Sequence, residues 1–141
     1  MVIDEFVGGH FSKMKSELTP GVKISITRSI TTTFEQYMAN IAWSDKLYSL
    51  PEFVKEWRIY IENHASWYDK LSHEVKSSPD FHQFLADKIN ETLEKILSEE
   101  PTEEQIKEIE ELEKELGREI NYSCKLEAKY WIETLKKKQN S

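Results

Sequence analysis

Four histidines and several nearby carboxylates are the residues whose types could hold a metal ion. Asp69 and His73 stand four residues apart, so on one helix they share a face and could ligate one ion or simply form a pair. A di-iron site in a helical bundle needs Glu-x-x-His on two helices, and no Asp or Glu stands three residues before any histidine. We therefore expect no metal and no cofactor, with Asp69 and His73 as a solvated pair and His64 as a hydrogen-bonded core residue.

Carboxylates and nucleophiles give no catalytic pattern either. The segment 99–103 has the letters of a magnesium-binding pattern found in all-helical nucleotide pyrophosphatases, but Pro101 prevents its carboxylates from sharing one helical face. Gly8-Gly9 lacks the Lys and Ser/Thr context of a phosphate-binding loop, and nothing marks a nucleophile elbow. We expect no catalytic residues, and a non-enzymatic role is favoured over an enzymatic one.

Large apolar residues outside the predicted helical stripes are the remaining functional signal. Such residues either widen the buried face of a helix or form a contact surface. The Glu-rich start of the last predicted helix offers a second surface, suited to a helical or basic protein partner. The candidate interaction residues are Trp43, Ile59 and Tyr130 together with Glu104, Glu108 and Glu111.

The composition limits the class of protein. A chain of 141 residues is long enough for one domain with a core that needs no disulfide, so we expect a single helical-bundle domain over 1–141. Aromatic residues make up 11% and glycine and proline number four each, which is typical of a folded chain with long helices. The net charge of −7 disfavours nucleic acid and anionic membranes as partners.

The compartment follows from the single cysteine and from the absence of long apolar runs. Cys124 has no partner for an intramolecular disulfide, and we expect it to pack as a small apolar residue. No apolar run approaches the roughly 20 residues of a membrane span, and the first residues lack a signal-peptide pattern. We expect a cytoplasmic protein whose partner is another protein or a second copy of itself, as a homodimer.

Helix-start signals divide the chain. Thr19, Ser49, Ser78 and Thr102 each stand where an N-cap residue precedes a run with helical spacing. With short links between them, the runs predict an all-α, antiparallel bundle. Residues 1–10 are expected to be a frayed or artificially added extension before a short N-terminal helix over 11–18. The four long helices are expected at about 22–48, 51–77, 79–98 and 102–138.

Two of these helices leave a choice. Residues 22–33 are rich in β-branched side chains and alternate as in a strand, yet Val22, Ile26 and Ile30 also continue a helical stripe. Because the chain offers no second strand for pairing, we predict a helix there. The helix over 102–138 would be about 55 Å long if continuous, so it either overhangs the bundle or breaks near Gly117.

The clearest stripe lies in 51–77, and it predicts the centre of the core. Its apolar or aromatic members are Phe53, Val54, Trp57, Tyr60, Ile61, His64, Trp67, Tyr68, Leu71 and Val75. We hypothesise an inhibitor- or immunity-type interaction protein that acts through an aromatic or acidic helical face. The alternative is a helical-bundle enzyme or a small-ligand or metal-binding protein, with a pocket near His64, Trp67 and Tyr68.

Overall fold

The fold is all-α, as the sequence predicts. The computed structural model describes residues 13–139, and within this range the regular elements are all helices. The ambiguous segment 22–33 lies inside a helix, so the prediction of helix over strand is confirmed. None of the described helices is both long and apolar enough to cross a membrane.

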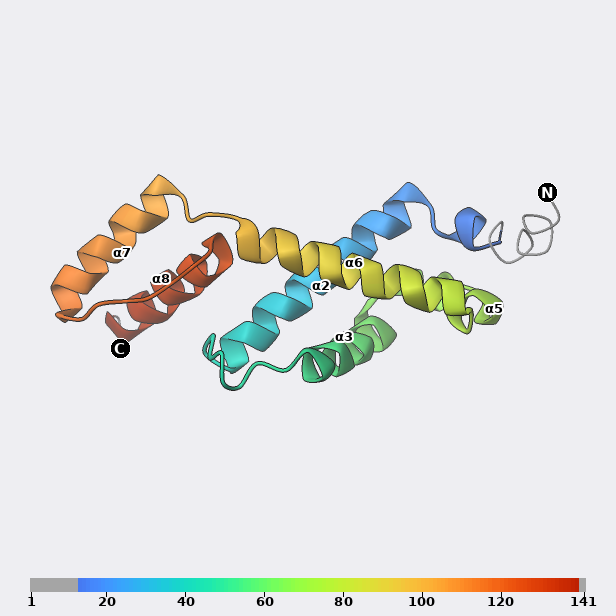
Figure 1. Cartoon of the computed structure of the whole chain (residues 1–141), viewed down its shortest axis with the longest axis horizontal. Coiled ribbons are helices and arrows are strands. Elements are labelled where there is room, and N and C mark those ends of the chain that lie inside the picture. The colour runs from blue at the N-terminus through green and yellow to red at the C-terminus, as the bar shows by residue number, and fades with distance from the viewer. Residues whose placement is uncertain (1–12, 140–141) are drawn as a thin grey trace.

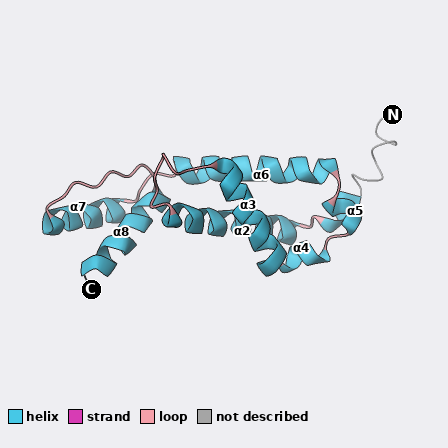
Figure 2. Cartoon of the chain, turned by 90° about the horizontal axis from the view of Figure 1, so that it is seen from below, coloured by secondary structure: helices cyan, strands magenta, loops and turns pink. Residues whose placement is uncertain are grey.

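A short helix at 13–17 precedes seven labelled helices (Figures 1 and 2). The predictions made for residues 1–10 lie outside the described residues. The labelled helices are α2 (Pro20–Asn40), α3 (Leu50–His64), α4 (Ser66–Lys70), α5 (His73–Lys76), α6 (Pro79–Ser98), α7 (Glu103–Leu116) and α8 (Lys125–Gln139). The predicted helix over 79–98 matches α6.

The helix predicted over 22–48 is too long at its C-terminal end. α2 ends at Asn40, and Ala42 and Trp43 follow with φ of 53° and 55°, in the left-handed region. The Trp43 N–H donates to the carbonyl of Met38 at 2.8 Å, a six-to-one bond of the kind that closes helix ends. The chain therefore leaves the helix well before residue 48.

The helix predicted over 51–77 is divided into α3, α4 and α5. Ala65 (ψ 104°) and Leu71 (ψ 142°) have extended backbones that end α3 and α4. At the second break, Ser72 donates from its backbone N–H (2.6 Å) and its hydroxyl (2.8 Å) to the Glu17 carboxylate. This carboxylate belongs to the short helix at 13–17, so a tertiary contact stabilises a break that local spacing does not indicate.

The helix predicted over 102–138 breaks at Gly117. This glycine has φ 64° and ψ 33°, and its N–H donates to the Glu113 carbonyl at 2.9 Å. Glycine adopts this left-handed conformation at little steric cost, which makes it a common residue at helix C-termini. The connection 117–124 then runs back along α7, and α8 begins beside the start of α7, where the Gln105 side chain donates to the Lys125 carbonyl at 3.2 Å. The two helices therefore run in the same general direction at one end of the molecule (Figure 1), and the antiparallel arrangement predicted for the bundle is wrong for this pair.

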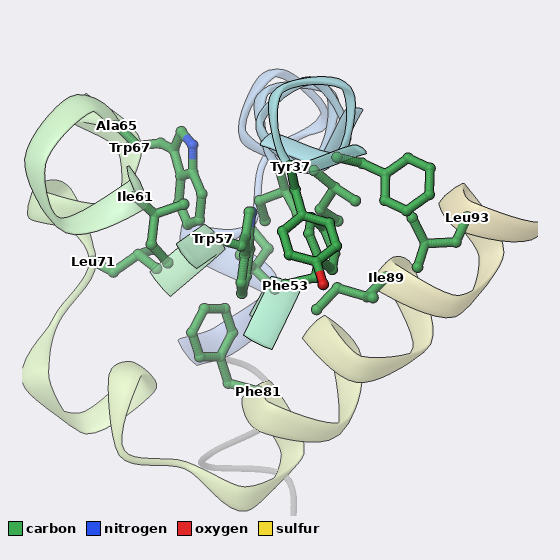
Figure 3. Close-up of a cluster of buried hydrophobic side chains, with 14 of the residues drawn as sticks. Tyr37, Phe53, Trp57, Ile61, Ala65, Trp67, Leu71, Phe81, Ile89 and Leu93 are labelled. Atoms are coloured by element: carbon green, nitrogen blue, oxygen red, sulfur yellow. The ribbon is translucent and has the colours of Figure 1, made fainter. Parts of the chain in front are cut away.

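The main hydrophobic core is built around α2, which packs against α3 and α6. Figure 1 shows α6 crossing α2 obliquely, and Figure 3 shows Phe53 and Trp57 of α3 among side chains of α2 and α6. The predicted stripe over 51–77 supplies six buried members of this core. They are Phe53, Trp57, Ile61, Trp67, Leu71 and Val75.

A second, smaller core lies between α7 and α8. Its buried residues are Ile109, Leu112, Ile120, Ala128, Ile132 and Leu135. The α7–α8 pair is joined to the rest of the chain by Leu126, which packs on the main core, and by an ion pair from Lys129 of α8 to Glu35 of α2 at 2.7 Å. Cys124 at the start of α8 is fully buried, as expected for a cysteine that packs as a small apolar residue.

Candidate functional site

The predicted ligand pocket at His64, Trp67 and Tyr68 is only partly assembled. His64 is exposed at the end of α3, so its prediction as a core residue is wrong; its ring lies 5.3 Å from the Tyr60 ring. His64 and Trp67 line a shallow hollow of about 330 Å³ that also includes Arg28. Tyr68 is not part of this lining and instead lies edge-to-face against Trp67, with ring centroids 5.9 Å apart.

The predicted Asp69–His73 pair is separated by a helix break. Asp69 lies in α4 and His73 in α5, with the extended residues Leu71 and Ser72 between them, so the two side chains do not share a helical face. Within residues 13–139, no group of three or more His, Cys, Asp or Glu side chains is arranged to hold a metal ion.

The six predicted interaction residues lie on four different elements. Ile59 is 52% exposed on α3, and Tyr130 is half-buried on α8. Glu104 and Glu111 are exposed on α7, whereas Glu108 forms an ion pair with a lysine of α8. Trp43 follows α2 and differs from the other five because it lines a cleft.

The cleft at Trp43 is open, has a volume of about 380 Å³ and lies between the main body and the α7–α8 pair. Its walls come from α2, the loop after it, the end of α6, the 117–124 connection and the start of α8. We call this the Trp43 cleft. Its lining residues are Phe34, Met38, Trp43, Asp45, Tyr48, Leu97, Asn121, Tyr122, Ser123 and Glu127.

The first wall is a tight turn in a strained conformation. The Ser44 N–H donates to the Ile41 carbonyl at 3.1 Å, and both residues between them, Ala42 and Trp43, have positive φ. Glycine, Asn and Asp dominate such positions, and a bulky residue there costs about 1–3 kcal/mol. The Trp43 ring packs edge-on against Phe34, with centroids 6.1 Å apart, which offsets part of this cost and fixes the indole at the cleft wall.

The loop beyond the turn is held by Tyr37, whose side chain is not among the predicted site residues. Its hydroxyl accepts a hydrogen bond from the Ser49 N–H at 2.8 Å and donates toward the Ser49 carbonyl at 3.3 Å. The Tyr37 ring also lies 6.2 Å from the ring of Tyr48, which lines the cleft. Burial raises the pKa of Tyr48 above its ordinary value, and the neighbouring Tyr37 raises it further.

The opposite wall contains a carboxylate with a fixed position. Glu127 accepts hydrogen bonds from the Ser123 N–H (2.9 Å), the Ser123 hydroxyl (3.0 Å) and the Trp131 indole N–H (3.4 Å). Beside it, burial raises the pKa of Tyr122, and the nearby carboxylates of Glu113 and Glu110 raise it further. Tyrosine hydroxyls ordinarily ionise at about pH 10, so both tyrosines of the cleft are neutral donors at physiological pH.

The lining combines aromatic rings with carboxylates. Phe34, Trp43, Tyr48 and Tyr122 supply the rings, and Asp45 and Glu127 the acidic groups. None of the described residues that line the cleft is Lys, Arg or His. Such a lining can bind and orient a ligand through ring faces and fixed negative charge.

Sequence reasoning misses Asp45, Tyr48, Tyr122 and Glu127 as site residues. It assigns the first two to the overlong helix 22–48, and the other two to the overlong helix 102–138. A signal is present in Ser44-Asp45, since Ser and Asp favour turns by bonding to nearby backbone. The convergence of the two segments depends on the return of 117–124 along α7 (Figure 1), and no local pattern carries that information.

A second hollow, of about 250 Å³, lies between α3 and α6. Its apolar lining includes Leu50, Val54, Leu85 and Ile89, and no carboxylate belongs to the described lining. Trp57, Arg58 and His82 also line it, so it offers a ring and a cation but lacks the pairing of rings with carboxylates found in the Trp43 cleft.

Comparisons of the chain with protein-family models, with curated proteins and with solved structures give no match. The chemistry of the lining residues is therefore the basis on which a function can be proposed.

Proposed function

We propose that this chain is a non-enzymatic interaction protein that binds a segment of a partner protein in the Trp43 cleft. The observation that carries this proposal is the convergence of four aromatic side chains on one open cleft. Tryptophan and tyrosine are enriched among the residues that dominate binding energy at protein interfaces. A cleft lined by these residues suits an anchor side chain of a partner.

The surface around the cleft extends the contact area. Leu47 is 63% exposed, Tyr48 37% and Leu97 49%, and the latter two belong to the cleft itself. A hollow of about 380 Å³ holds one or two side chains, so a stable complex needs such neighbouring contacts as well. The exposed Leu47 side chain, which is outside the cleft lining, supplies one such contact.

The cleft is also organised before binding. Tyr37 holds the loop that carries Tyr48, and Ser123 and Trp131 hold the carboxylate of Glu127. A preorganised surface loses less side-chain entropy when a partner binds, which favours affinity. This rigidity supports a binding role for the cleft.

Selection from a displayed library of random peptides, followed by fluorescence anisotropy, tests the proposal. The variant Trp43→Gly removes the indole and keeps a residue that adopts positive φ freely, so the turn itself is preserved. The matched control is Ile59→Ala, which removes an exposed apolar side chain on α3. We expect W43G to weaken binding at least tenfold, with I59A close to wild type.

Two results would contradict the proposal. One is a library that yields no binders to the wild-type protein. The other is a set of binders whose affinity is unchanged in W43G. The predicted homodimer is tested separately by size exclusion with light scattering, where a dimer that W43G dissociates would identify a second copy of the chain as the partner.

A further inference from the structure

We infer that the group recognised in the Trp43 cleft is an organic cation, the ammonium of a lysine or the guanidinium of an arginine on the partner segment. This inference rests on the proposed function and adds the chemistry of the anchor. It follows from the juxtaposition of aromatic rings with carboxylates in a lining whose described residues include no Lys, Arg or His.

The aromatic rings provide the first half of the recognition. Trp43, Tyr48 and Tyr122 come from the two sides of the cleft, the post-α2 loop and the 117–124 connection. The face of an aromatic ring is electron-rich and attracts a cation, with tryptophan the strongest of the three ring types. Both tyrosines are neutral at physiological pH, as tyrosines ordinarily are, and burial raises the pKa of each further.

The carboxylates provide the second half. Asp45 makes no hydrogen bond or ion pair with another residue in the described part of the chain, so its charge is available to a ligand. Glu127 has both oxygens oriented by Ser123 and Trp131. A carboxylate accepts about four hydrogen bonds, so the three donors at Glu127 leave it able to accept one more, from an ammonium or guanidinium N–H.

The same features disfavour the other classes of anchor. An acidic side chain would face two carboxylates with no cation in the described lining to offset them. A purely apolar side chain would contact the rings but leave the charges of Asp45 and Glu127 without a partner. A cation gains from both the rings and the carboxylates.

The test uses pairs of small molecules that differ in charge but hardly in shape. Choline is compared with 3,3-dimethylbutan-1-ol, and n-butylammonium with n-butanol, by NMR titration read at the Trp43 indole of the full chain. The variants are Asp45→Asn and Glu127→Gln, which remove charge and keep size. The control is Glu56→Gln on α3, which changes the net charge equally at an exposed position outside the cleft.

We expect the cations to shift the Trp43 signal at millimolar concentration and the neutral analogues to leave it unchanged. D45N and E127Q should each weaken cation binding roughly fivefold to tenfold, because each removes one charged contact to a partly desolvated ligand. E56Q should bind as the wild type does. Added salt should weaken binding, since the charges lie in an open cleft.

Equal shifts from neutral and charged analogues, or no shift from any cation, would overturn the inference. Peptide binders that lack Lys and Arg yet depend on Trp43 would also overturn it, while the proposed function would stand. Cation binding to a chain that yields no peptide binders would overturn the proposed function instead, and a small free amine would then be the source of the cation.

Discussion

Two buried hydroxyls, one helical turn apart on α2, should respond in opposite ways to removal. The Ser29 hydroxyl accepts a hydrogen bond from the Trp57 indole N–H at 3.0 Å and donates to the Ile26 carbonyl at 2.6 Å. Thr33 is equally buried, and its Oγ1 has no hydrogen-bond partner among the described residues. Ser29→Ala therefore leaves a buried N–H unpaired, whereas Thr33→Val removes a buried group that is unpaired already.

The expected changes in unfolding free energy follow from the environment of each hydroxyl. An unpaired buried indole N–H costs about 1–3 kcal/mol, and the better helix propensity of alanine returns about 0.5 kcal/mol, so S29A should lose about 0.5–2.5 kcal/mol of unfolding free energy. Thr and Val are similar in shape and helix propensity, so T33V should gain about 1 kcal/mol from the lost desolvation penalty. For a chain of 141 residues, 1 kcal/mol corresponds to a change in Tm of about 3 °C.

Thermal and urea unfolding of the two variants check the prediction, and a double-mutant cycle isolates the hydrogen bond. In a Trp57→Phe background no indole N–H remains at this position, so adding Ser29→Ala should cost much less than it does in the wild type. Loss of stability in T33V comparable to that in S29A would refute the assignment of paired and unpaired hydroxyls. So would equal costs of S29A in the two backgrounds.

Three further predictions concern the backbone and the tyrosines. Ala42→Gly should raise the unfolding free energy by about 0.5–1 kcal/mol, because Ala42 is exposed and has φ 53°. The control, Ala86→Gly at an exposed position inside α6, should lower the unfolding free energy by about 1 kcal/mol. Urea unfolding measures both. Gly117→Ala should destabilise the chain by about 1–2 kcal/mol through φ alone, since nothing lies within 4 Å of the added Cβ, and an unchanged urea midpoint would contradict this. Tyr48 and Tyr122 have pKa values raised above 10.0 in the folded chain, so the folded state favours their protonated forms. This contribution to stability is complete below about pH 10 and disappears as the pH rises through the folded pKa values. The double variant Y48F/Y122F should therefore lose less stability than the wild type at high pH, as measured by urea unfolding.

The cleft shows where sequence reasoning succeeds and where it fails. The sequence singles out Trp43 because this residue does not fit the stripe of its predicted helix, and the structure places it in a cleft wall. The physical reason differs from the predicted one, since Trp43 lies in a turn after α2 and not on a helical face. The residue that organises the loop, Tyr37, gives no signal in the sequence beyond its place in an apolar stripe.

Whether the sequence predicts a helix end correctly depends on whether the contact that caps this end lies within one turn of it. The N-caps Thr19 and Ser49 each accept a hydrogen bond from the backbone three residues on, and Thr102 and Gln105 form the full capping box. These contacts span one turn, so the sequence itself indicates them. At Ser78 the cap position is correct, but its side chain makes no capping bond.

The sequence by itself determined the helical class, the helix starts and most of the buried stripe, because these depend on spacing and on neighbours within a turn. The tertiary structure alone decided the break at Ser72, which is stabilised by Glu17 from 55 residues away, and the placement of Trp43 and Glu127 in the lining of one cleft. Contacts between distant residues stabilise these features, and hydrophobic periodicity reports only which face of a helix is buried, not which other segment covers it.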